Sequence, residues 1–288
     1  MATIVTLDVF SGRPNPTWLL PDDHHAKLTE RLNAVQQPTA QKASGVLGGL
    51  GYRGFTVRHT PDSPALHSDF HVHEGIIDKG LKETNLISQD RELESWLLTT
   101  AGDAIPNEVR AHVEAEIKKP AAPAAELFRP PVPVKCPHCY AVDAVPYNPG
   151  KWNIPSVQPH NNCYNYANDH ITNTFAQPGR AHGKQYTALS CPGVDPAAVA
   201  DGLVNTANFT TPLAAGHGWY VALVIWPNVD YHWYRQDNVG CWSHKPGSTA
   251  ARNTDNSGKP ITDPKTCNRG TYTVFCTYMI TKRTVVIH

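Results

Sequence analysis

Short β-rich stretches bounded by turn residues recur along this chain, and they set its predicted architecture. In the first half of the chain, strands are predicted at 2–10, 52–59 and 70–73. In the second half, they are predicted at 218–226, 231–236, 241–244 and 270–280. A hairpin turn is expected at 237–240, because its Asp-Asn-Val-Gly sequence suits a tight connection between antiparallel strands.

Helical patterns occur in both halves of the chain, and five segments are predicted to be helical: 22–35, 92–98, 106–119, 162–172 and 195–201. In the first of these, Leu28 and Leu32 lie on one face, and an aspartate precedes them as a cap. In the last, Asp195 is expected to cap the helix and Pro196 to occupy its first turn. Together with the strands, these helices indicate an α+β fold.

A proline- and alanine-rich stretch divides the chain into two parts. Residues 119–134 are predicted to form an extended, semi-rigid linker. The linker separates a small α+β domain at 1–118, whose role the sequence does not indicate, from a second domain at 135–288. All the cysteines lie beyond the linker, which supports a domain boundary there.

Charge and hydropathy exclude several classes of partner. The chain has 288 residues and a formal net charge of zero, so bulk charge gives no support to binding of nucleic acid or of an anionic membrane. The longest apolar run, at 219–226, is far too short to cross a bilayer. No secretory signal is visible at the N-terminus, and the compartment stays open, with secretion expected if the cysteines are paired.

The seven cysteines allow three interpretations. They lie at positions 136, 139, 163, 191, 241, 267 and 276. An odd count fits three disulfides and one free thiol, but a zinc site or a set of reduced thiols fits as well. The motif Cys136-Pro137-His138-Cys139 has the spacing of a redox pair or of half a zinc site, although a structural cross-link is the default.

One set of residues suggests a reaction. Cys163 is predicted to open a helix, where the helix N-terminus lowers the pKa of a thiol. His232 lies on a predicted strand, and the hairpin register places it opposite Ser243 or His244. In this interpretation Cys163 is a nucleophile, His232 is its general base and His244 orients His232. Asp237, in the turn, is the alternative third member.

The order and spacing of Cys163, His232 and His244 resemble those of the NlpC-type branch of papain-like cysteine peptidases, over residues 145–288. The resemblance implies a helix packed on an antiparallel sheet and a thiol hydrolase that cleaves an amide bond through an acyl-enzyme. It also implies a peptide or peptidoglycan-like substrate and no cofactor. Three tryptophans near these residues are candidates for lining a substrate groove: Trp152, Trp233 and Trp242.

A histidine cluster supports a different interpretation. His71 and His73 point to the same side of a predicted strand, and His67 or Glu74 can join them as metal ligands. An exposed edge strand rich in histidine explains the same pattern without a metal. The alternative to a hydrolase is therefore a non-enzymatic binding or toxin-like protein that is stabilised by disulfides or by a metal.

Overall fold

The computed structural model describes residues 2–35, 37–39, 49–59, 69–79, 85–87, 90–120 and 134–288. Contacts between residues divide the chain into two compact units. The N-terminal unit comprises Met1–Val9, Asn15–Gly48 and Tyr52–Pro130. The C-terminal unit comprises Phe10–Pro14, Gly49–Gly51 and Pro131–His288, so it includes two short segments from the first half of the chain. Both units combine helices with an antiparallel sheet, and the expected α+β class is confirmed.

The N-terminal unit is built on a seven-stranded sheet with the strand order β2-β1-β4-β5-β6-β7-β3. Its strands are β1 (Thr3–Leu7), β2 (Thr17–Leu20), β3 (Gln37–Thr39), β4 (Phe55–His59), β5 (Phe70–His73), β6 (Ile76–Asp78) and β7 (Asn85–Ile87). Its helices are α1 (His25–Ala34), α2 (Glu92–Thr99) and α3 (Asn107–Ile117), with short 3-10 turns η1 (Asp22–His24) and η2 (Gly102–Ala104).

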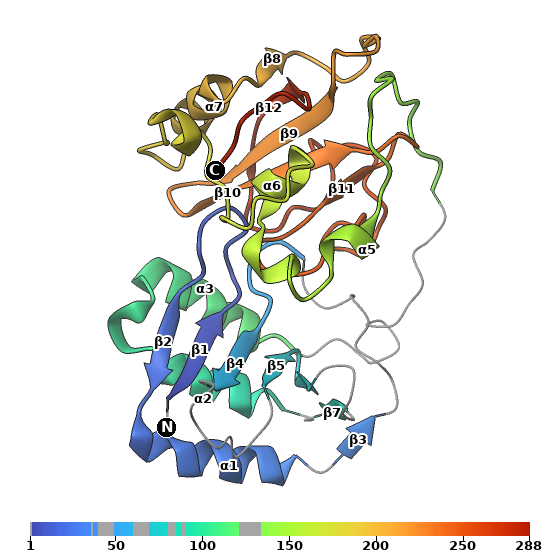
Figure 1. Cartoon of the computed structure of the whole chain (residues 1–288). Coiled ribbons are helices and arrows are strands. Elements are labelled where there is room, and N and C mark those ends of the chain that lie inside the picture. Colours follow the sequence, from blue (N-terminus) through green and yellow to red (C-terminus); the bar gives the residue numbers. More distant parts are fainter. Residues whose placement is uncertain are drawn as a thin grey trace. The chain divides into compact units, whose positions relative to one another are not determined.

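Alternation along its strands decides which face of this sheet is buried. In β1, Val5 and Leu7 are buried, whereas Ile4 and Thr6 between them are half-exposed. Side chains of period two alternate between the two faces of a sheet, so one face is apolar and packed. Figure 1 shows α2 and α3 on one side of these strands, and their inward-facing residues, Leu97 included, complete the core.

The sequence missed the short strands of this sheet. The strand predicted at 2–10 is only five residues long in the structure. After the turn residues that follow it, the chain forms a second strand, β2, which was not predicted. β3, β6 and β7 have three residues each, which is too short for a periodic pattern to be recognised.

The C-terminal unit contains a five-stranded sheet with the strand order β11-β10-β9-β12-β8. Its strands are β8 (Val204–Thr206), β9 (Trp219–Trp226), β10 (Asp230–Gln236), β11 (Trp242–His244) and β12 (Val274–Thr281). Its helices are α5 (Pro149–Trp152), α6 (Cys163–Ala167) and α7 (Cys191–Ala200), with 3-10 turns η3 (Gln158–His160) and η4 (Arg180–His182). Every residue of β9, β10 and β11 is buried, so these three strands are covered on both faces, whereas β12 and β8 at the other side of the sheet include exposed positions.

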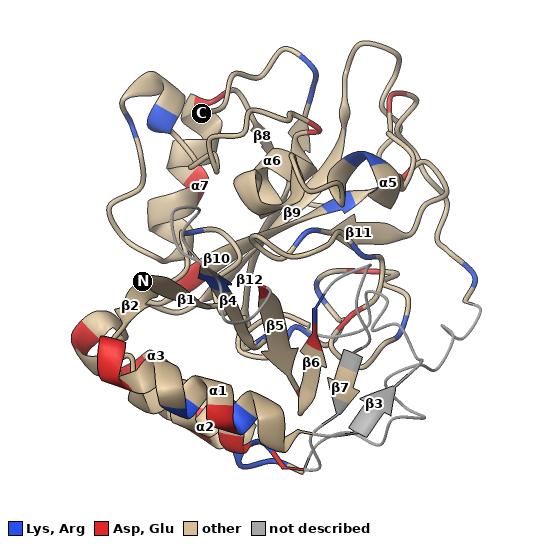
Figure 2. Cartoon of the chain, turned by 60° about the horizontal axis from the view of Figure 1, so that its bottom comes forward, with Lys and Arg blue, Asp and Glu red and all other residues tan. Residues whose placement is uncertain are grey.

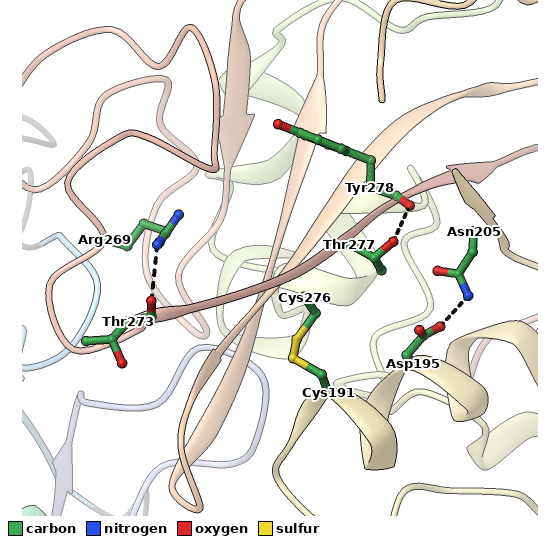
Figure 3. Close-up of a disulfide and its surroundings, with 8 residues drawn as sticks. All are labelled: Cys191, Asp195, Asn205, Arg269, Thr273, Cys276, Thr277 and Tyr278. Atoms are coloured by element: carbon green, nitrogen blue, oxygen red, sulfur yellow. Dashed lines mark hydrogen bonds between the residues drawn. A yellow bond between two sulfur atoms is a disulfide. The ribbon is translucent and has the colours of Figure 1, made fainter. Parts of the chain in front are cut away.

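Two disulfides connect elements of the C-terminal unit. Cys136 is bonded to Cys241, the residue before β11, across 105 residues of sequence. Cys191, the first residue of α7, is bonded to Cys276 in β12 (Figure 3). The remaining cysteines of the chain are free thiols: Cys139, Cys163 and Cys267. The cysteines are therefore divided between two cross-links and three free thiols, rather than three cross-links and one thiol.

Two helices of this unit differ from their predictions. α6 ends at Ala167, five residues early, because Asp169 takes a left-handed backbone conformation (φ 55°) that a helix cannot contain. α7 begins at Cys191, four residues before the predicted cap Asp195, and Pro196 lies inside it. Pro192 follows Cys191 and satisfies the preference for proline in a first turn. The signal for the helix start was therefore Pro192 rather than Pro196.

Candidate functional site

Cys163 begins α6, as the sequence predicted, and Asn162 holds that helix end. The side-chain oxygen of Asn162 accepts the backbone N–H groups of Tyr164 and Asn165, and the Asn165 side chain accepts the N–H of Asn162 in return. This reciprocal arrangement satisfies three donors that a helix start leaves free. The Asn162 amide also donates to the carbonyl of Gly12. One asparagine therefore both caps α6 and attaches it to the segment Phe10–Pro14.

The thiol of Cys163 is sealed from solvent, with 0% of the residue exposed. Burial raises the pKa of this thiol well above its ordinary value, and the nearby carboxylate of Asp230 raises the pKa further. A backbone hydrogen bond from Trp233 and the charge of Lys245 oppose the shift without cancelling it. The thiolate, which is the nucleophilic form, is therefore strongly disfavoured at this position.

His232 and His244 form a hydrogen-bonded pair. Nδ1 of His244 lies 2.9 Å from Nε2 of His232, and both residues are fully buried. Nε2 of His244 lies 3.0 Å from the carbonyl oxygen of Thr254, so this nitrogen must donate. In the neutral pair, Nδ1 of His244 is then the acceptor and Nε2–H of His232 is the donor. The register differs from the prediction, because Tyr234 rather than His232 stands opposite His244.

The structure brings the two histidines together, and helix α6, which begins with Cys163, packs on the side of β10 that carries Trp233. Side chains alternate along a strand, so Trp233 and His232 project to opposite faces. Trp233 packs on Tyr164 of α6, with ring centroids 5.3 Å apart. The His232 ring instead contacts His244 and Tyr272. Figure 1 shows α6 lying across one face of the sheet, the face to which Trp233 points.

Asp237, the alternative third member, belongs to an ion pair. Its carboxylate accepts hydrogen bonds from Arg235, at 3.2 Å, and from Ser243, at 2.8 Å. Burial raises the pKa of Asp237 to about 6, although the guanidinium of Arg235 opposes the shift. Arg235 also donates to the Tyr166 carbonyl and to the Asp169 carboxylate. These contacts make Asp237 part of the packing between α6 and β10.

The three tryptophans proposed to line a groove are all in the interior. Trp152, Trp233 and Trp242 are at most 1% exposed. Trp152 packs on Tyr166 with ring centroids 5.2 Å apart, and Trp242 packs on Phe209 at 5.4 Å. Aromatic pairs of this kind contribute packing energy to a core.

The weak metal candidates lie in the N-terminal unit. His71 is half-buried, with Nε2 3.8 Å from a carboxylate oxygen of Asp8. His73 is buried and packs against the ring of Tyr52. His67 lies outside the described residues. Within the described ranges, no group of three or more His, Cys, Asp or Glu side chains is arranged to hold a metal ion.

Sequence reasoning missed Asp230, which accepts several hydrogen bonds in the interior of the C-terminal unit. Its carboxylate accepts the backbone N–H groups of Ser11 at 2.5 Å, Gly12 at 3.2 Å and Arg13 at 3.2 Å. The Tyr272 hydroxyl donates to it as well, at 2.5 Å. Asp230 and Gly12 are 218 residues apart, so no local pattern could have revealed the contact. The only signal was a carboxylate at the start of a strand that continues with Tyr231, Trp233 and Tyr234.

Gly12 is fixed by contacts on every side. Its carbonyl oxygen accepts hydrogen bonds from the side chains of Asn162, Gln177 and Tyr231. A Cβ atom at this position would lie 2.4 Å from the ring of Tyr231. Only glycine fits here. The contacts of Gly12 and Asp230 hold backbone in place.

Lys245 has the same kind of role. Its ammonium is buried and donates to three backbone carbonyls, those of Gln158, Asn161 and Gly247. A buried charge is tolerated when such contacts replace water. The polar centre of the C-terminal unit is thus a set of side chains that bind the main chain.

No helix in the described ranges is long and apolar enough to span a membrane.

Comparisons with known proteins give one informative relative. The chain is 52% identical over 129 residues to insoluble matrix shell protein 1 of Ruditapes philippinarum. These residues are 45% of this chain and 84% of the relative. No protein-family model matches the chain, and no solved structure gives a significant match.

This relative overturns the resemblance to NlpC-type cysteine peptidases, and with it the interpretation as a thiol hydrolase of peptide or peptidoglycan-like substrates. The relative is named as a shell matrix protein rather than as a peptidase or amidase. The spacing misled because residues in the right order along the chain need not be accessible or ionisable: Cys163 is fully buried and its pKa is raised.

Proposed function

We propose, because the chain belongs to the family of insoluble matrix shell protein 1, that it is a non-enzymatic structural protein of an insoluble extracellular matrix. The observation that carries this proposal is the 52% identity to a matrix protein over 84% of that protein's length. The alternative that the sequence left open, a binding protein stabilised by disulfides, agrees with it.

The state of Cys163 supports a structural role. A thiol nucleophile has to be partly exposed and easily ionised. Cys163 is neither, since it is fully buried and its pKa is raised. The buried histidines are used in structural contacts. His232 of β10 is hydrogen-bonded to His244 of β11, and His244 in turn donates to the Thr254 carbonyl.

The disulfides support an extracellular location. Two long-range bridges, with sequence separations of 105 and 85 residues, form and persist in an oxidising compartment. They close long loops and so restrict the unfolded chain. We include in this proposal the division into a domain at 1–118, a linker at 119–134 and a domain at 135–288, with the second domain as the cross-linked scaffold.

Alkylation of the native protein tests the role of Cys163. We expect iodoacetamide at pH 8 to label the half-buried thiols Cys139 and Cys267 slowly, and Cys163 only after unfolding, as read by mass spectrometry of peptides. Cys139 and Cys267 are internal controls, because burial also raises their pKa values, that of Cys267 to about 12. Labelling of Cys163 ahead of both controls in the folded protein would overturn the proposal.

Fractionation tests the matrix assignment directly. When the tissue or culture that produces the protein is extracted in sequence with buffer, salt and chelator, the protein should remain in the pellet. Recovery of most of it in the first aqueous extract would contradict a matrix role. A Cys163→Ser variant should fractionate as the parent does, because the thiol performs no chemistry in this proposal.

A further inference from the structure

One face of the seven-stranded sheet carries a row of polar side chains, three of which are threonines. Residues that pair across neighbouring strands project to the same face. The strand registers align five of them, one from each of β2, β1, β4, β5 and β6: Thr17, Thr6, Thr56, His71 and Asp78. Adjacent strands are ~4.8 Å apart, so the row repeats at that interval. We call this set the threonine row.

The threonine row is accessible, in contrast to the opposite face of the same sheet. Thr17 is exposed, and the other four members are half-exposed. Leu19, two residues along β2, is 65% exposed and stands beside the row. The hydroxyl oxygens of Thr6 and Thr17 are 3.2 Å apart and share a hydrogen bond at the surface. Helices α2 and α3 lie on the other side of the strands (Figure 1).

A buried carboxylate fixes the orientation of part of the row. Asp8 is 3% exposed and accepts the hydroxyl proton of Thr56 at 2.6 Å. The amide of Asn15 donates to the same carboxylate at 2.8 Å, and Nε2 of His71 lies 3.8 Å from it. Because the Thr56 hydroxyl donates inward, its lone pairs remain as acceptors for a ligand. Such fixed groups bind with a smaller loss of conformational entropy.

The face carries few charged groups, and they are of both signs: Arg58, Asp78 and the buried Asp8. This restricts its partner. β1, β2 and β5 contain no Lys, Arg, Asp or Glu, and Figure 2 shows these strands without coloured residues. Arg58 of β4 and Asp78 of β6 are the charged residues of this face within the described strands. A mineral or a polyanion requires a surface with charge of one sign. Hydroxyls at a regular spacing beside an apolar residue complement a neutral, repeating, hydroxylated polymer.

We propose that the threonine row binds an insoluble neutral polysaccharide in extended form. The proposal rests on the proposed function, since it names what a matrix protein of this kind would hold. Hydroxyl groups of the row donate to and accept from hydroxyls or amides of the polymer, and Leu19 covers an apolar face of a sugar ring. Both the threonine row and the polymer repeat at regular intervals, so many weak contacts can form at once. Several weak contacts made together can hold a solid without a deep cleft.

Binding to solid powders tests the proposal. The full-length protein is mixed with chitin powder, microcrystalline cellulose or calcium carbonate, and the free fraction is measured after centrifugation. We expect binding to at least one polysaccharide, with little change between low and high salt, and no comparable binding to calcium carbonate. A Thr6→Val, Thr17→Val double variant should bind about tenfold more weakly, since two surface hydrogen bonds are lost while strand propensity is kept.

Matched variants separate recognition from loss of folding. Thr206→Val removes a strand hydroxyl in the C-terminal unit and should bind as the parent does. Thr6→Lys with Thr17→Lys places bulk and charge in the row and should abolish binding, with an unchanged melting temperature and circular dichroism as the check on folding.

Three outcomes would overturn the proposal: no binding of the parent to either polysaccharide, stronger binding to calcium carbonate, or equal binding by the double valine variant and the Thr206→Val control. None of these affects the alkylation result for Cys163. The polysaccharide proposal and the proposed structural role can therefore fail independently.

Discussion

The two sheets of this protein differ in how many of their faces are buried. In the N-terminal unit, β1 alternates between buried and half-exposed residues, and β2 between buried and exposed ones. In the C-terminal unit, β9 and β10 are buried at every position. A sheet with one open face can leave its polar side chains in water, whereas a sheet covered on both faces must satisfy them internally.

This difference explains where the polar networks lie. Asp230, Arg235, Asp237, His244 and Lys245 belong to β10, β11 or the residues next to them, and all are at most 1% exposed. Each is bonded to backbone or to another buried side chain. In the N-terminal sheet, Thr6 and Thr17 face outward and remain available to a ligand. Polar residues in one sheet therefore specify structure, and in the other they form a surface.

Reduction of the disulfides should produce the largest difference in stability between the two units. Every cysteine lies beyond residue 135, so a reductant removes both bridges from the C-terminal unit and none from the N-terminal unit. Loop closure over 85 and 105 residues predicts a loss of about 4.7 kcal/mol of unfolding free energy per bridge. Native-state hydrogen exchange should show faster exchange in β9, β10 and β12 and unchanged exchange in β1 and β4. Equal acceleration in both sheets would contradict the comparison.

The same substitution should have very different effects in the two sheets. Leu223 in β9 is 0% exposed, and Leu19 in β2 is 65% exposed. Leu223→Ala leaves a cavity in a packed interior and should lower the free energy of unfolding by about 3 kcal/mol. Leu19→Ala should change it by less than about 0.5 kcal/mol. Urea unfolding of both variants provides the measurement, and similar losses would mean that the N-terminal sheet is covered on its second face.

Prediction from sequence succeeded where the pattern is local. β-rich stretches between turn residues identified β1, β4 and β5, and the turn at 237–240 correctly joined β10 to β11. The hairpin places His232 and His244 within hydrogen-bonding distance, although the predicted register was wrong and Tyr234 stands opposite His244. The three-residue strands were missed because they carry too few residues for any period.

Prediction failed where the outcome depends on packing. Helix α6 packs through Tyr164 on Trp233 of β10, whereas the ring of the neighbouring residue His232 packs on His244. The sequence does not show which face of a strand a helix covers. The contact of Asp230 with Ser11 and Gly12 joins residues more than 200 positions apart. The local pattern of a single sequence carries no signal for such contacts.

The smallest of these effects concerns pH, and it arises from the sheet with two buried faces. Burial raises the pKa of Asp237 from 3.8 to about 6 in the folded protein. A raised carboxyl pKa means that the folded state binds the proton more tightly than the unfolded state does. The stabilisation from this group is then fully present below pH ~4 and is lost as the pH rises through about 6.

The expected change is about 2–3 kcal/mol of unfolding free energy between pH 4 and 7. It is obtained as the difference between the pH profiles of the parent and of Asp237→Asn in urea unfolding. The asparagine variant cannot titrate at this position, so its profile should lack the decline between pH 4 and 7. Parallel profiles would mean that Arg235 and Ser243 compensate fully for burial of the carboxylate. The pKa of Asp237 would then be the same in the folded and unfolded protein.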